Sequence, residues 1–248
     1  MLGAVCGMLE PMTTRPRLLL VAHGTRSATG RRVVGRVLLE TRKQLGGAGG
    51  DGVDCRLAWV DVQSPGPSRV LADGVPTVVV PVFLARGYHV IHDVGQACDQ
   101  APGPVVQTPH LGAEPEVVRA VVQRLAEAGA VGAFGADAVV LGAAGSRDES
   151  SLTETRELAQ ALARLLGVPV VAAFSSTATP TVADAVAALR ADGHRRVGVA
   201  THLLAPGFFA DRIAVAGGNI TSEPLGAHPE IVELIVRRYR EYAPLLIG

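Results

Sequence analysis

The sequence has no excess of charge of either sign. Its 23 lysines and arginines equal its 23 aspartates and glutamates over 248 residues, so the formal net charge is zero. A balanced chain lacks the basic surface that non-specific binding to nucleic acid or to an anionic membrane requires. We therefore expect neither a nucleic acid nor a membrane among its partners.

Cysteine is also scarce. Cys6, Cys55 and Cys98 are odd in number and have no spacing typical of a metal site, which argues against a disulfide framework. The beginning of the chain has no basic segment and differs from a signal peptide. No apolar run is long enough to cross a bilayer. These absences predict a soluble, cytoplasmic protein, in which residues 1–11 could precede a true start at Met12.

The signatures of three common site classes are missing as well. No GxGxxG follows the first predicted strand, no segment ends in GK[ST], and no GxSxG is present. The sequence therefore does not indicate a dinucleotide site, a phosphate-binding P-loop or a nucleophile elbow. A His/Asp hydrolase is accordingly the weakest functional alternative.

The sequence does contain an internal duplication. Three segments recur in the same order: VAHGTR (21–26) as GAAGSR (142–147), VFLARGYHV (82–90) as HLLAPGFFA (202–210), and LGAEPEVV (111–118) as LGAHPEIV (225–232). Matching residues are 121, 120 and 114 positions apart, and such a stable separation indicates two copies of one domain. We expect an extension over 1–15, a first domain over 16–129 and a second over 136–248.

Each copy alternates short apolar runs with longer amphipathic stretches. In the first copy we expect strands near 17–22, 55–60, 77–84 and 104–108, and helices near 28–45, 66–73, 93–100 and 114–128. The second copy repeats this order through DAVVLGA, PVVAAF, RVGVATHLL and NITSEP. Nearly continuous apolar runs are typical of parallel strands covered on both faces. The predicted fold class is α/β, with two similar doubly wound domains that have small parallel sheets.

Polar residues follow three strands of the first copy. His23 comes after the first strand, Asp61 after the second, and His89 a few residues after the third. Ligands of open parallel sheets bind at the carboxyl ends of strands, where the strand order reverses. In a sheet of order 2-1-3-4 the first and third strands are neighbours. His23 and His89 would then meet over one crevice.

The second copy serves as an internal control for these candidates. Ala144 stands at the position of His23, Ser176 at that of Asp61 and Phe209 at that of His89. The neighbouring glycines are present in both copies, so the scaffold was kept while the polar set was lost. This joint loss indicates one shared purpose for the three residues. His92 could face the same crevice, although a loop or helix-cap position suits it better, and Asp93 is suited to cap a helix.

The segments LLLVAHGTR, AWVDVQSPGPSRVL, VVVPVFLARGYHVIHDV and PHLGAEPEVV resemble the sirohydrochlorin chelatases of the small class II chelatase family. Members insert Fe²⁺ for siroheme, or Co²⁺ for cobalamin, into an octa-carboxylate tetrapyrrole. The resemblance covers most of the first copy, whereas the second keeps only the fold signature. A duplicated form with one degenerate half is similar to the two-domain actinobacterial members.

The resemblance implies roles for individual residues. His23 and His89 match the two catalytic, metal-contacting histidines, and Asp61 falls near a glutamate of many members and would assist them. Neutral imidazoles suit iron and cobalt as ligands and can accept a proton near neutral pH. Substrate carboxylates would be held at the first and third strand ends. The residues expected there are Thr25, Arg26, Arg86 and Tyr88.

Several alternatives stay open at this point. We expect Fe²⁺ as the metal substrate, with no permanently bound cofactor, but the residues give no way to exclude Co²⁺. A non-catalytic carrier of tetrapyrrole or metal could use the same crevice. We expect a monomer whose second half completes the crevice. In that half Phe208 and Phe209 would offer apolar surface to the macrocycle or belong to the core.

Overall fold

The computed structural model describes residues 15–46, 52–87, 90–132 and 135–247 of the chain. Of the expected extension over 1–15, only Arg15 falls within this part. Two expected site residues, Tyr88 and His89, lie outside the described residues. Among the described helices, none is long and apolar enough to cross a membrane.

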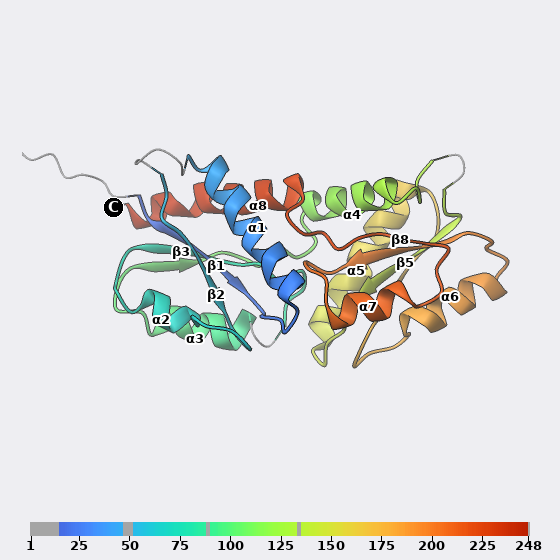
Figure 1. Ribbon diagram of the computed structural model, residues 1–248, viewed down its shortest axis with the longest axis horizontal. Coiled ribbons are helices and arrows are strands. Elements are labelled where there is room, and N and C mark those ends of the chain that lie inside the picture. The colour runs from blue at the N-terminus through green and yellow to red at the C-terminus, as the bar shows by residue number, and fades with distance from the viewer. Residues whose placement is uncertain (1–14, 47–51, 88–89, 133–134, 248) are drawn as a thin grey trace, which may run out of the picture.

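Eight strands form two parallel sheets of the same topology. The first sheet contains β1 (Arg17–Ala22), β2 (Cys55–Trp59), β3 (Thr77–Pro81) and β4 (Val105–Gln107), in the order β2-β1-β3-β4. The second contains β5 (Ala138–Ala143), β6 (Val170–Phe174), β7 (Val197–His202) and β8 (Ile220–Thr221), in the order β6-β5-β7-β8. The predicted α/β class and the duplication are confirmed (Figure 1), and both sheets have the 2-1-3-4 order on which the meeting of His23 and His89 was conditional.

The helices follow the strands in the expected alternation. The first copy has α1 (Ala28–Gln44), α2 (Pro67–Leu71), a π-helical turn (Val90–Val94) that continues into α3 (Gly95–Asp99), and α4 (Pro115–Glu127). The second has α5 (Glu149–Leu166), α6 (Val182–Ala191), α7 (Phe208–Ala214) and α8 (Pro229–Tyr242), followed by a 3₁₀ turn (Ala243–Leu246). The third strand is shorter than predicted. It ends at Pro81, which has no N–H to donate to the ladder.

Alternating residues of each central strand enter two separate cores. In β1, Leu18 and Leu20 face the core under α1, whereas Leu19 and Val21 face the core that contains residues of α2 and α3. All four side chains are fully buried. This burial on both faces explains why the strand reads as a continuous apolar run rather than as an alternating pattern.

The last helix of each copy packs on the sheet of the other copy. Helix α8 comes from the second copy but lies against α1 and β3, and α4 comes from the first copy but lies against β7 and α5 (Figure 1). Apolar residues of both helices, including Val121 and Ile235, belong to one core that also contains Leu20 and Leu141. The two sheets therefore share a continuous core, and the exchange fixes one half against the other.

Ion pairs reinforce the contact between the two exchanged helices. A carboxylate oxygen of Glu114, at the N-cap of α4, lies 2.6 Å from the guanidinium of Arg238 in α8, and its second oxygen lies 2.8 Å from Arg237. Arg237 also binds Glu116 at 2.9 Å. Burial of Glu116 favours its neutral form, but the hydrogen bond from Arg237, a backbone hydrogen bond and the charges of Arg237 and Arg119 together outweigh burial and lower the pKa of this carboxyl. Arg238 is 6% exposed and therefore needs its carboxylate partner.

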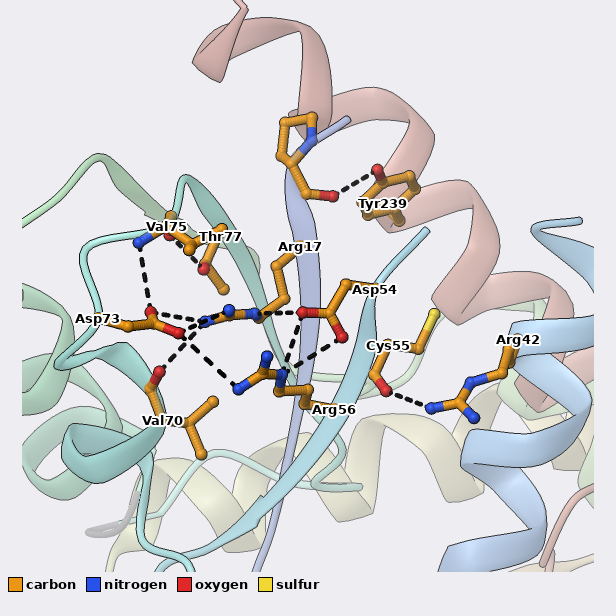
Figure 2. A network of polar contacts seen from close by, with 11 residues as sticks. Arg17, Arg42, Asp54, Cys55, Arg56, Val70, Asp73, Val75, Thr77 and Tyr239 are labelled. Carbon is orange, nitrogen blue, oxygen red and sulfur yellow. Dashed lines mark hydrogen bonds and ion pairs between the residues drawn. The ribbon is translucent and has the colours of Figure 1, made fainter. Parts of the chain in front are cut away.

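Figure 2 shows a second polar network, at the amino end of β1. The guanidinium of Arg17 is buried and binds Asp54 at 2.9 Å, Asp73 at 2.7 Å and the carbonyl of Val70 at 3.1 Å. The hydrogen bond from Arg17 lowers the pKa of Asp73 to about 2. Beside it, the Tyr239 hydroxyl of α8 donates to the carbonyl of Pro16 at 2.7 Å. The start of β1 is thus anchored both to its own sheet and to the exchanged helix.

We predict that Glu114→Gln lowers the free energy of unfolding by about 1–3 kcal/mol, because it leaves the nearly buried Arg238 without a carboxylate. Urea denaturation followed by circular dichroism measures this change. Glu223→Gln, which alters an exposed carboxylate, is the matched control. Equal stability of the two variants would show that the ion pairs between the exchanged helices do not hold the halves together.

Candidate active site

A cavity of about 1250 Å³ opens between the carboxyl ends of the two sheets. Its walls are the loops that follow β1, β2 and β3 in the first copy and β5, β6 and β7 in the second. The site therefore lies where strand order reverses in both sheets, which is where ligands of open α/β sheets bind. Its volume exceeds the roughly 300–1,000 Å³ of common small-molecule pockets, so it suits a large ligand.

His23 lines this cavity immediately after β1. Its ring lies edge-on to Phe83, which follows β3, with 6.4 Å between the ring centroids. The next residue, Gly24, has a φ of +100°, and a Cβ added there would lie 2.0 Å from the carbonyl oxygen of Asp61. The amide of Asp61 in turn donates to the carbonyl of His23 at 3.1 Å. The glycine thus permits two loops to touch and sets the direction of His23.

Gln63 holds the turn after His23. Its amide oxygen accepts from the backbone N–H of Thr25 at 2.8 Å, and its amide nitrogen donates to the carbonyl of Thr25 at 2.6 Å. Sequence reasoning did not single out Gln63. Alignment of the two copies could have identified Gln63, because Ala178 stands at this position in the second copy.

The expected site residues are distributed unevenly around the cavity. Thr25 and Arg26 line it together with His23, and His92 also lines it. Asp61 is exposed and is not among the lining residues, and its carboxylate accepts from the N–H of Val62 at 2.7 Å. Among the described residues, no three His, Cys, Asp or Glu side chains are grouped closely enough to bind one metal ion.

Arg86 contacts the second copy rather than the cavity. Its side chain is not among the lining residues, and its charge contributes to lowering the pKa of Asp148, although hydrogen bonds from Ser150 are the main cause. Tyr88 and His89 lie outside the described residues. The structure therefore brings together His23, Thr25 and Arg26, and places Asp61 and Arg86 at the periphery.

The second copy keeps the scaffold of this site without its histidine. Gly145 has a φ of +94°, and an added Cβ would lie 2.0 Å from the carbonyl oxygen of Ser176. The Ser176 amide donates to the carbonyl of Ala144 at 2.9 Å. Ala144 lines the cavity as His23 does. The backbone contacts of the two loops are thus equivalent, and the side chains alone distinguish the halves.

Comparison with known proteins assigns the chain to a family. A family model described as CbiX matches residues 17–128 and again residues 138–242. The chain belongs to the CbiX family. Among curated proteins, no sequence matches it significantly.

Solved structures of the sirohydrochlorin chelatase SirB and of CbiX share the fold. SirB from Bacillus subtilis subspecies spizizenii, in complex with cobalt, is 19% identical with a TM-score of 0.72, over 93% of this chain and 96% of that chain. SirB from Bacillus subtilis with Fe³⁺ is 21% identical with a TM-score of 0.72, over 92% and 96%. CbiX, the terminal enzyme of siroheme biosynthesis in denitrifying bacteria, is 18% identical with a TM-score of 0.64, over 91% and 98%.

His202 is a buried histidine in the wall that the second copy of this CbiX-family chain contributes. It ends β7, lines the cavity and is 3% exposed, and it stands at the position of Val82 in the first copy. Within the described structure, neither ring nitrogen has a hydrogen-bond partner. Burial lowers the pKa of His202 to about 4, and the backbone of Leu84 and the charge of Glu154 offset this only in part. The ring is therefore neutral at pH 7.

We predict that His202→Val weakens the loss of stability at acidic pH. In the wild type the folded state binds this proton only near pH 4, whereas the unfolded chain binds it near pH 6.5, so stability falls as the pH decreases between these values. The contribution reaches about 3 kcal/mol at pH 4. Urea denaturation at pH 7.5, 5.5 and 4.5 measures it. Parallel pH profiles for the variant and the wild type would contradict the assignment.

Glu154 of α5 connects the second copy to the loop that follows β3. Its carboxylate accepts from the backbone N–H of Arg86 at 2.7 Å and lies 2.8 Å from Nε2 of His110. Burial favours the neutral form of Glu154, but the hydrogen bonds to His110 and Arg86 outweigh burial and lower the pKa of this carboxyl. The second copy thereby holds the loop that leads to His89.

We predict that Glu154→Ala lowers the free energy of unfolding by about 1–3 kcal/mol, because the N–H of Arg86 and the ring of His110 lose their shared acceptor. Thermal and urea denaturation measure the change. The matched control is Glu157→Ala, since Glu157 lies on the same helix and is exposed. A loss no larger than that of the control would show that the loop does not depend on this carboxylate.

Proposed function

We propose that this chain inserts a divalent metal into sirohydrochlorin. The observation that carries the proposal is the position of His23, which projects from the end of β1 into a large cavity between the two halves of a CbiX-family chain. Proteins that share its fold include sirohydrochlorin chelatases with cobalt or Fe³⁺. The flat, large macrocycle fits the space between two facing sets of loops.

The chemistry needs a ligand for the incoming ion and an acceptor for protons. When the ion enters the ring, it replaces two protons on pyrrolic nitrogens, and these protons must leave with a base. Imidazole suits both tasks, because it binds iron and cobalt when neutral and titrates near neutral pH. We assign these tasks jointly to His23 and His89. Asp61 would assist from the periphery, since its loop contacts the backbone of His23.

The ring would be held by its carboxylates and by its faces. Thr25, Arg26 and Tyr88 are the proposed contacts for carboxylates in the first copy, and Arg86, which is outside the cavity lining, would contribute only from the periphery. Phe208 and Phe209 line the cavity in the second copy, are 68% and 39% exposed, and form an edge-to-face pair with 5.5 Å between centroids. Their exposure supports a role in contact with the macrocycle rather than in the core.

We propose Fe²⁺, and hence siroheme, as the first choice of metal substrate and product, with Co²⁺ as the alternative. Metal selectivity does not follow from ligand type alone, because imidazole binds both ions. One chain supplies both walls of the cavity, which supports a monomeric enzyme. A cytoplasmic location and the lack of a permanent cofactor are part of the same proposal.

We predict that His23→Ala reduces metal insertion at least about 100-fold, the usual contribution of a positioned acid or base. Purified protein is mixed anaerobically with sirohydrochlorin and either Fe²⁺ or Co²⁺, and the absorbance change is compared with the spontaneous rate. His194→Ala, which alters a histidine outside the cavity lining, is the control. Wild-type rates in His23→Ala would refute the proposed site, and tetrapyrrole binding without insertion would favour the carrier alternative.

A further inference from the structure

We infer that Arg147, in the half that lacks counterparts of His23 and His89, is a second anchor for a substrate carboxylate. The inference rests on the proposed function and extends it to the degenerate copy. Arg147 follows Gly145 as Arg26 follows Gly24, and both arginines line the cavity, one from each half. The sequence segments that contain them, AHGTR and AAGSR, differ at the histidine but both keep the arginine.

The backbone that carries the two arginines is held in the same way. The hydroxyl of Thr25 accepts from the N–H of Ser27 at 3.1 Å, and the hydroxyl of Ser146 accepts from the N–H of Asp148 at 3.0 Å. Each turn ends at a helix cap, Ser27 for α1 and Asp148 for α5. The two arginines therefore line the cavity from equivalent turns.

The guanidinium groups of Arg26 and Arg147 bind no other group in the described part of the protein. Both side chains are exposed, and within the described structure neither guanidinium has a hydrogen-bond or ion-pair partner. Other arginines, such as Arg17, Arg237 and Arg238, bind carboxylates of the chain. An arginine in a ligand cavity with its donors unused is suited to a carboxylate, which it can bind through two parallel hydrogen bonds.

Asp148, the acidic residue next to Arg147 in the sequence, has its carboxylate bound by other groups. The Asp148 carboxylate accepts from the N–H of Ser150 at 2.9 Å and from its hydroxyl at 2.7 Å, which commits it to the cap of α5. These two hydrogen bonds, with a smaller contribution from Arg86, lower the pKa of Asp148. Arg147 is thereby left available for a ligand.

The pair of arginines gives the second copy a function of its own. His23, Asp61 and His89 were replaced by Ala144, Ser176 and Phe209, whereas Arg26 kept its counterpart. The ligand class that fits two such arginines in one cavity is a macrocycle with carboxylates at separate points of its rim. The first half thus supplies the reacting groups, and both halves hold the ligand.

The test uses binding of metal-free uroporphyrin, an octa-carboxylate porphyrin, followed by its absorbance and fluorescence. We expect Arg147→Ala to raise the Kd about tenfold, the effect of losing one charge-assisted hydrogen bond, and Arg147→Lys to recover part of it. The matched control is Arg164→Ala, which removes the same charge from an exposed position of α5 outside the cavity lining. The affinity of Arg147→Ala should also depend less steeply on salt.

The outcomes separate this inference from the proposed function. In the insertion assay, Arg147→Ala should raise the KM for sirohydrochlorin about tenfold with little change in kcat, because the contact is equal in ground and transition states. If the wild type binds and metallates tetrapyrroles but Arg147→Ala behaves like Arg164→Ala, this inference alone fails. If the wild type neither binds uroporphyrin nor metallates sirohydrochlorin, the proposed function fails with it.

Discussion

The exchange of α4 and α8 is the constraint on which the rest of the structure depends. Each helix belongs to one copy by sequence and packs on the sheet of the other, so the two sheets share one apolar core. Separating the halves would expose that core and break the ion pairs of Glu114 with Arg237 and Arg238. The cavity between the carboxyl ends therefore has two walls in a fixed relation, which a ligand that contacts both walls requires.

The two walls differ in chemistry but not in backbone. Gly24 and Gly145 allow the same close contact between neighbouring loops, at positive φ and with the carbonyl of the next loop 2.0 Å from an added Cβ. On this common scaffold one wall presents His23 and the other Ala144. The second wall also has contacts of its own, because Glu154 binds the backbone of Arg86 and Arg147 is the proposed anchor for a carboxylate.

Comparing the two copies of the domain predicted more of the site than the amino-acid composition of the chain did. The joint loss of His23, Asp61 and His89 in the second copy is the reason for proposing the first copy as the reacting half, and the 2-1-3-4 order assumed for the sheet is the one observed. Arg86 and Arg147 illustrate the limit of that reasoning. Both were visible in the sequence, but Arg147 is among the residues that line the cavity and Arg86 is not. The direction of a loop side chain depends on packing that a linear pattern does not encode.

The sequence by itself determined the α/β class, the duplication and the position of His23 at a strand end. These features follow from local apolar patterns and from turn residues, which act over a few positions. Only the tertiary structure decided that α4 and α8 change partners, that His202 is buried without a hydrogen-bond partner among the described residues, and that Glu154 binds the backbone of Arg86. Each of these depends on contacts between residues distant in the chain, which no local pattern specifies.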